Sequence, residues 1–275
     1  MNLVAQGPAM TAAHADELAK LAGVLPVAIS GQAFRFEGAK PHPSLASWCD
    51  ERHIDHAFVP AGRRFADLKL LALDMDSTLI TIECIDELGA LAGKKAEVAA
   101  VTAQAMRGEI DYPESLRRRV AAIAGLSESS LSEVYEERLR LTPGAEVLLA
   151  KCKAHRVQVL LVSGGFTFFT ERLKARLGLD HTISNVLEVK GGRLTGALLG
   201  DIVDADAKAG KFLQVKKKLN ARTEETVAIG DGANDLKMMA QAGLSVAFRA
   251  KPVVRAQAHC ALNWSGLDAV VNLFE

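Results

Sequence analysis

The sequence has no excess of charge of either sign. Lysine and arginine together number 33, and so do aspartate and glutamate, so the formal net charge at pH 7 is zero. Proteins that bind nucleic acid usually carry a basic excess because they neutralise phosphates. We read the local basic runs at 117–119 and 216–218 as solvated helix faces. The composition therefore argues against nucleic acid as a partner.

Cysteine is scarce, and long hydrophobic runs are absent. The four cysteines (Cys49, Cys84, Cys152 and Cys260) lie far apart, without the paired spacings of a metal site. Reduced thiols of a cytosolic protein are the simplest interpretation. No apolar segment reaches the ~20 residues that span a bilayer. The first residues lack the basic and apolar regions of a signal peptide. We expect a cytoplasmic protein with no membrane partner.

Short apolar runs alternate with helical patterns along most of the chain. With 49% hydrophobic and 24% charged residues, the composition is that of a globular protein. Strand-like runs occupy 69–74, 157–163, 226–231, 244–248 and, more weakly, 259–262. Helical patterns occupy 143–155, 206–219 and 233–243. This alternation predicts an α/β fold with a parallel sheet.

Three regions depart from that alternation. Residues 84–140 contain helical patterns, such as 95–108 and 127–139, and predict a helical cap inserted after the first strand. Residues 185–203 carry a Gly-Gly turn between alternating runs and predict a hairpin. Residues 1–65 predict a small α+β domain, with a helix at 13–23, a strand at 26–38, a helix at 44–53 and a strand at 54–60. Residues 66–275 would then form the main domain.

Acidic residues follow two of the predicted strands. Asp74 and Asp76 end the first strand, in DMDST, and Asp231 ends another, in GDGAND. A single aspartate at such a place commonly caps a turn. Because parallel strands end at the same edge of a sheet, these carboxylates are expected to meet there. Mg²⁺ prefers a few acidic ligands and would offset their repulsion.

Groups suited to phosphate follow the other elements. Ser163 and Gly164 lie in SGG after an apolar strand, where backbone N–H groups can approach a ligand closely. Lys208 lies in the first turn of a predicted helix, where an ammonium can neutralise charge in phosphoryl transfer. Alone, each would be read as an ordinary turn or a surface lysine.

The order DxDST, SGG, Lys and GDGAND closely resembles the haloacid-dehalogenase-like phosphatases over about residues 69–275, and within them the branch that hydrolyses phosphoserine. The resemblance implies a Rossmann-like core. It also implies that Asp74 is the nucleophile, that Asp76 is the acid and base, and that phosphate binds to Ser163, Gly164, Lys208 and Asn234. Mg²⁺ would be held by Asp74, Asp76 (through its backbone carbonyl) and Asp231, with Asp235 in a supporting role.

Residues in and near the predicted cap indicate which branch of the family the chain resembles. Glu83 and Arg119 match the pair that grips the amino and carboxylate groups of the substrate, and such a pair suits an amino acid physically. Met106 and Tyr112 match the apolar lining, although phenylalanine is familiar at the second position. The implied reaction converts O-phospho-L-serine to L-serine and phosphate, the last step of serine biosynthesis, through an aspartyl-phosphate.

Two other functions share parts of this pattern. A related phosphatase or phosphotransferase could act on another small phosphometabolite, such as phosphohomoserine. A phospho-acceptor switch also uses aspartate, Mg²⁺ and lysine, but it gives no role to Asp76 or to the long cap. Residues 1–65 could be regulatory, could make the protein a homodimer, or could be structural support; the sequence does not choose among these.

Overall fold

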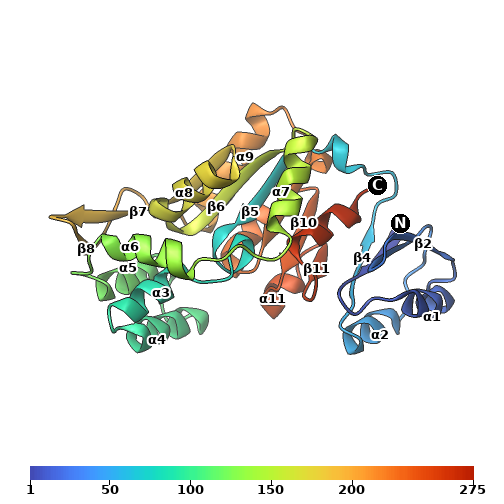
Figure 1. Ribbon diagram of the computed structural model, residues 1–275, viewed down its shortest axis with the longest axis horizontal. Helices are drawn as coiled ribbons and strands as arrows, with labels where there is room; N and C mark the ends of the chain where they lie inside the picture. Colours follow the sequence, from blue (N-terminus) through green and yellow to red (C-terminus); the bar gives the residue numbers. More distant parts are fainter.

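Two sheets organise the computed structural model, which describes residues 1–275 (Figure 1). The larger has seven strands in the order β11-β10-β9-β5-β6-β7-β8. Every neighbouring pair is parallel except β7 and β8, which form an antiparallel hairpin. The strands are β5 (Leu70–Asp74), β6 (Gln158–Phe166), β7 (His181–Lys190), β8 (Arg193–Leu199), β9 (Thr226–Gly230), β10 (Leu244–Phe248) and β11 (Cys260–Leu262).

The central strand β5 is buried on both faces, as its unbroken apolar sequence requires. Alternate residues point to opposite sides. Leu71 and Leu73 pack in one hydrophobic cluster with α7 (Ala145–Ala154) and α8 (Thr167–Leu177). Leu70 and Ala72 pack in another with α9 (Ala205–Lys218), α10 (Leu236–Met239) and α11 (Pro252–Arg255). The result is the predicted α/β core, with helices on both faces of a mostly parallel sheet.

The helical cap predicted at 84–140 is present between β5 and β6. It consists of α3 (Cys84–Leu91), α4 (Lys95–Met106), α5 (Tyr112–Ala122) and α6 (Ser129–Glu133), the last continued by a wide helical turn to Arg138. The Asp111 carboxylate caps α5 by accepting the N–H of Glu114 at 2.8 Å. The N–H of Gly125, just after α5, donates to the carbonyl of Leu194 in β8 at 2.8 Å, so the hairpin supports the cap.

The N-terminal residues form a separate antiparallel sheet with the order β2-β3-β1-β4. Its elements are β1 (Asn2–Gln6), α1 (Ala12–Ala22), β2 (Pro26–Ser30), β3 (Ala33–Phe36), α2 (Leu45–Glu51) and β4 (Asp55–Val59). The α+β composition is as predicted. The sequence reasoning missed β1, however, and the single strand expected at 26–38 is a hairpin of two strands.

The N-terminal sheet packs on the C-terminal segment of the chain, at the end of the molecule away from the cap (Figure 1). Val4, Ala57 and Val59 belong to the same hydrophobic cluster as Phe274. The buried Asp55 carboxylate accepts the backbone N–H groups of residues 263–265 at 2.7–3.1 Å. The sheet is therefore fixed to the core by apolar and polar contacts. The division into domains 1–65 and 66–275 stays a prediction.

Two boundaries differ from the sequence prediction. The helix expected over 233–243 is only a 3₁₀ turn (Ala233–Asp235) followed by the single turn of α10. Gly243 lies against the backbone of Thr223, where a Cβ would come within 2.3 Å of the carbonyl oxygen, so the chain must turn there into β10. The predicted hairpin begins earlier, at His181, because β7 also pairs with β6. No helix is long and apolar enough to cross a membrane.

Candidate active site

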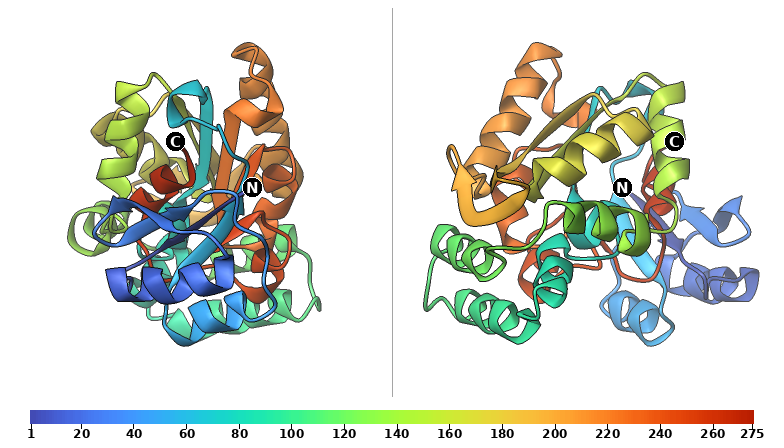
Figure 2. Two further views of the ribbon diagram at one scale, coloured as in Figure 1. Left: turned by 90° about the vertical axis from the view of Figure 1, so that its right-hand side faces the viewer. Right: turned by 60° about the vertical axis from the view of Figure 1, so that its left-hand side comes forward.

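The carboxyl ends of β5, β6 and β9 lie together at the edge of the sheet that faces the cap (Figure 2). The chain passes from β5 to β6 on one side and later returns to β9 on the other, so a crevice opens where the strand order reverses. A cavity of about 990 Å³ lies there, between the sheet edge and the cap. Asp74 and Asp231 line it from the sheet, and Met106 and Arg119 line it from the cap.

The loop after β5 turns sharply to bring two carboxylates to the cavity. Asp76 is extended (φ −66°, ψ 136°), and Ser77 adopts a left-handed conformation (φ 57°). Oδ1 of Asp76 accepts the backbone N–H of Cys84 at 2.8 Å, and Oδ2 accepts the hydroxyl of Ser163 at 3.3 Å. Burial, together with the nearby charge of Glu83, raises the pKa of Asp76 to about 7. The carboxyl group can therefore give up and take up a proton near neutral pH.

Lys208 lies in the first turn of α9, with its ammonium between the carboxylates of Asp74 and Asp235. Its Nζ donates to Oδ1 of Asp74 at 2.6 Å and to Oδ1 of Asp235 at 2.8 Å, and the lysine is fully buried. Burial by itself would lower the pKa of Lys208, but the two carboxylates raise it above its ordinary value. The lysine therefore stays charged, and its ammonium is held in place by both carboxylates.

Asp74, Asp231 and Asp235 form an acidic cluster whose ligand oxygens lie within 4.8 Å of one another. Burial raises the pKa of Asp231 to about 7, with the charge of Asp235 adding to it, and burial raises the pKa of Asp74 well above its usual range. Closely placed carboxylates with raised pKa values are stabilised by a cation. An all-oxygen set suits a hard divalent cation. The cluster contains two of the three predicted metal ligands, Asp74 and Asp231, and its third member is Asp235, which was given a supporting role.

Glu83 and Arg119 line the same cavity from the start of α3 and from α5. Oε1 of Glu83 accepts the hydroxyl of Ser77 at 2.7 Å, and burial raises the pKa of Glu83. Arg119 donates to the carbonyl of Ser115 at 3.4 Å. A carboxylate and a guanidinium are thus both available to a ligand in one cavity.

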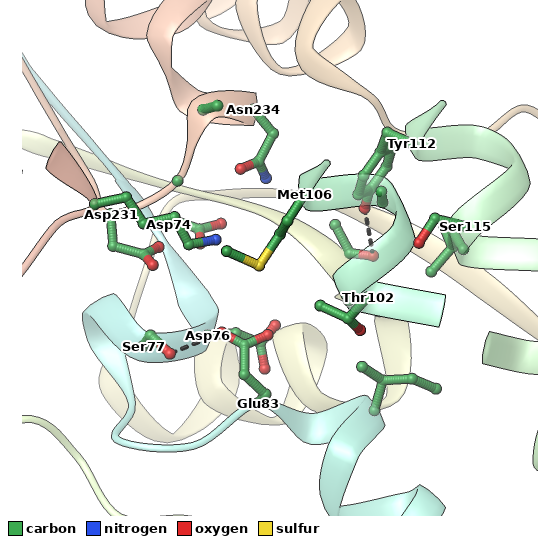
Figure 3. Close-up of a pocket in the computed structure, with 18 of the residues that line it drawn as sticks. Asp74, Asp76, Ser77, Glu83, Thr102, Met106, Tyr112, Ser115, Asp231 and Asn234 are labelled. Carbon is green, nitrogen blue, oxygen red and sulfur yellow. Dashed lines mark hydrogen bonds between the residues drawn. The ribbon is translucent and has the colours of Figure 1, made fainter. Parts of the chain in front are cut away.

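Figure 3 shows Asp74, Asp76, Asp231 and Glu83 around the hollow, with the Met106 side chain projecting into it. The hydroxyl of Tyr112 donates to the carbonyl of Gly164 at 3.2 Å, which joins the cap to the end of β6. Asn234 lines the cavity from the turn after β9. Every predicted site residue except Ser163, Lys208 and Asp235 lines the cavity, and these three lie directly behind its wall.

The sequence reasoning missed several residues of the site. Thr102 and Ser115 line the cavity from the cap, and Lys251 lines it from the segment after β10. The N–H of Lys251 donates to the carbonyl of Asp231 at 3.1 Å, which fixes the turn that carries this carboxylate. None of the three stands at the end of a predicted strand or in a motif. Thr102 and Ser115 could have been indicated only by predicting which face of each cap helix points to the cavity.

Comparisons with known proteins agree with this geometry. The haloacid dehalogenase-like hydrolase family model matches residues 71–240, and a domain of unknown function matches residues 3–45. A phosphoserine phosphatase of Polaromonas sp. is 55% identical over 215 residues, which cover 76% of this chain and 91% of the relative.

Solved structures give the same picture. A probable phosphoserine phosphatase from Vibrio cholerae, in unliganded form, superposes with a TM-score of 0.86 at 38% identity, over 99% of this chain and 86% of the other. A phospho-aspartyl intermediate analogue of phosphoserine phosphatase superposes with a TM-score of 0.71 at 36% identity, over 76% of this chain and 99% of the other. The chain belongs to the haloacid dehalogenase-like hydrolase family.

Proposed function

We propose that this chain is a Mg²⁺-dependent phosphoserine phosphatase that hydrolyses O-phospho-L-serine to L-serine and phosphate. The observation that carries the proposal is one cavity with two ends. Asp74, Asp76 and Lys208 lie at the sheet end, and Glu83 and Arg119 lie toward the cap. The first set suits phosphoryl transfer, and the second suits the ammonium and carboxylate of an amino acid. The similarity to phosphoserine phosphatases supports the same assignment.

In the first step, the Asp74 carboxylate attacks phosphorus, and the bond from phosphorus to the serine oxygen breaks. Lys208 already binds Oδ1 of Asp74, which leaves Oδ2 without a hydrogen bond from the protein and available for attack. Asp76, in its protonated form, donates a proton to the departing serine oxygen. Its pKa of about 7 allows this form to be populated near neutral pH.

In the second step, water hydrolyses the aspartyl-phosphate. Asp76 is now ionised and takes a proton from the water as the water oxygen attacks phosphorus. The bond from phosphorus to the Asp74 oxygen breaks and phosphate leaves, so Asp74 is again a carboxylate and Asp76 is again protonated. Ser163, Gly164, Lys208 and Asn234 hold the phosphoryl oxygens in this proposal. Asp235 keeps Lys208 in place through its 2.8 Å ion pair.

The Asp74 and Asp231 carboxylates and the Asp76 backbone carbonyl would hold Mg²⁺. The oxygen-only donor set and the mutual proximity of the carboxylates at Asp74, Asp231 and Asp235 fit this ion. When bound, Mg²⁺ neutralises phosphate charge and aligns the group for in-line attack.

The deciding experiment measures Mg²⁺-dependent phosphate release from a panel of phosphomonoesters. We expect phosphoserine to have a higher kcat/KM than phosphothreonine, phosphohomoserine or a sugar phosphate. Preference for the sugar phosphate would refute the proposed substrate. A phosphorylated protein that persists for many minutes would instead favour the phospho-acceptor switch, because a phosphatase hydrolyses its intermediate rapidly.

A further inference from the structure

The carbonyl oxygen of Gly164 receives hydrogen bonds from two distant parts of the chain. Nδ2 of Asn185, on β7, donates to it at 2.8 Å. The hydroxyl of Tyr112, on the cap, donates to it at 3.2 Å (Tyr112 is labelled in Figure 3). Asn185 is only 2% exposed, so its amide must be satisfied inside the protein. This buried asparagine has no part in the mechanism given above.

The hydrogen bond from Asn185 fixes the plane of the peptide between Gly164 and Gly165, beside the proposed phosphate site. A carbonyl and the N–H of the next residue point in opposite directions because the peptide is planar. The N–H of Gly165 is thereby directed to Oγ of Ser163, at 2.8 Å, and this hydroxyl donates to Oδ2 of Asp76 at 3.3 Å. A continuous series of contacts therefore runs from Asn185 to the acid and base.

The other end of the same amide reaches the helix that carries Lys208. Oδ1 of Asn185 accepts the N–H of Val203 at 2.8 Å. The next residue, Asp204, caps α9 by accepting the N–H groups of Asp206 and Ala207 at 3.0 and 2.9 Å. One side chain thus connects residues 163–165, at the end of β6, with the start of α9, the helix that carries Lys208.

We propose that Asn185 is a positioning residue that aligns residues 163–165, at the end of β6, with the start of α9, which carries Lys208. The proposal rests on the proposed phosphatase function. The position requires an amide because it must donate to Gly164 and accept from Val203 at once. Aspartate would keep the second contact but place a carboxylate oxygen against the Gly164 carbonyl. Loss of this alignment should lower the rate of phosphoryl transfer, which is sensitive to displacements below 1 Å.

The test compares Asn185→Asp and Asn185→Ser with Ser184→Ala as the matched control. Ser184 is the preceding residue on β7, and its hydroxyl forms a hydrogen bond with the hydroxyl of Thr170, on α8, at 2.7 Å. We expect both Asn185 variants to lower kcat on the order of 10- to 100-fold, with a smaller change in KM. Ser184→Ala should keep kcat within about twofold of the wild-type value, even if it lowers the melting temperature as much as the Asn185 variants do. The serine variant retains a small polar side chain, so it covers the case in which the aspartate variant does not fold.

Folded Asn185 variants with the kcat of the wild type would overturn the proposal, as would an equal loss in Ser184→Ala. A substrate without an amino acid separates this proposal from the proposed function. Because Asn185 acts at the phosphoryl end, the loss should be the same with p-nitrophenyl phosphate. If the wild-type protein hydrolyses p-nitrophenyl phosphate but not phosphoserine, the proposed substrate is refuted. The role of Asn185 is then still tested by comparing the kcat of its variants and of the wild type on p-nitrophenyl phosphate.

Binding of inorganic phosphate in the presence of Mg²⁺, measured by calorimetry, gives a readout that does not depend on turnover. Asn185→Asp and Asn185→Ser should weaken this binding, whereas Ser184→Ala should not. Equal phosphate affinity in all four proteins would contradict the assigned role.

Discussion

The ammonium of Lys208 lies 2.6 Å from Oδ1 of Asp74, at the end of a fully buried lysine side chain. A buried charge is costly unless it is paired, and here the lysine is paired twice, with Asp74 and with Asp235. The arrangement occupies one oxygen of Asp74 and leaves the other for the phosphorus atom. It also means that the lysine contributes to folding as well as to the reaction.

Replacing Lys208 with methionine should therefore reduce both stability and turnover. The change leaves two buried carboxylates without their shared cation, a loss on the order of 3–5 kcal/mol in the free energy of unfolding. Denaturant unfolding of the metal-free protein measures it. Lys217→Met, on an exposed position of the same helix, is the control and should change stability by less than about 0.5 kcal/mol. Equal stability of the two variants would disprove the structural role of the buried pair.

Replacing Asp76 with asparagine should abolish most turnover while preserving the fold. Asparagine has nearly the same shape but offers no proton to the departing serine oxygen and cannot accept one from water. We expect kcat to fall by about 10²- to 10⁴-fold. The exposed Asp201→Asn is the control and should behave as wild type. Full turnover in Asp76→Asn would exclude Asp76 as the acid and base.

The metal-free protein should lose stability as the pH rises from about 4 to about 7. Burial raises the pKa of both Asp76 and Asp231 from 3.8 to about 7 in the folded state. Between these values the folded state holds protons that the unfolded state has released, so the free energy of unfolding falls with rising pH. Thermal melts at several pH values measure this slope.

Asp231→Asn removes one of the two groups and should make the decline shallower than in the wild type. Saturating Mg²⁺ should raise the melting temperature most at the upper end of this range, where the carboxylates are ionised. A wild-type slope identical to that of Asp231→Asn would show that Asp231 does not titrate as stated.

Glu83→Gln and Arg119→Leu should impair phosphoserine hydrolysis much more than p-nitrophenyl phosphate hydrolysis. Each removes a charged partner of the amino acid, worth about 1.5–3 kcal/mol, or roughly 10- to 100-fold in kcat/KM. Neither residue hydrogen-bonds Asp74 or Lys208. The charge of Glu83 helps to raise the pKa of Asp76, but Asp76 acts on both substrates, so this effect leaves the ratio of their kcat/KM values unchanged. The ratio of kcat/KM for the two substrates is the measurement. Equal losses on both substrates would indicate that these residues support the fold of the cap and not the choice of substrate.

Local sequence was enough to place the reacting groups. The short apolar run ending in Asp74 is typical of a strand buried on both faces, and parallel strands bring their carboxyl ends to one edge. The cap was recognisable because helical periodicity continues from 84 to 140 with no strand between. Both features depend on residues that are close together in the sequence, so they can be predicted from sequence patterns.

Tertiary contacts decided the rest. Asn2 and Gln6 make β1 look polar, yet the strand pairs with both β3 and β4. The two side chains are buried because they donate to Glu275 and to the carbonyl of Ala269, far away in the chain. Asn185 resembles any polar residue in a strand until the fold brings Gly164 and Val203 to its two ends. The chemistry of the chain can be recognised from short patterns of neighbouring residues, such as DxDST and GDGAND. The alignment of these parts follows from the folded chain, because it depends on hydrogen bonds between residues that are distant in the sequence.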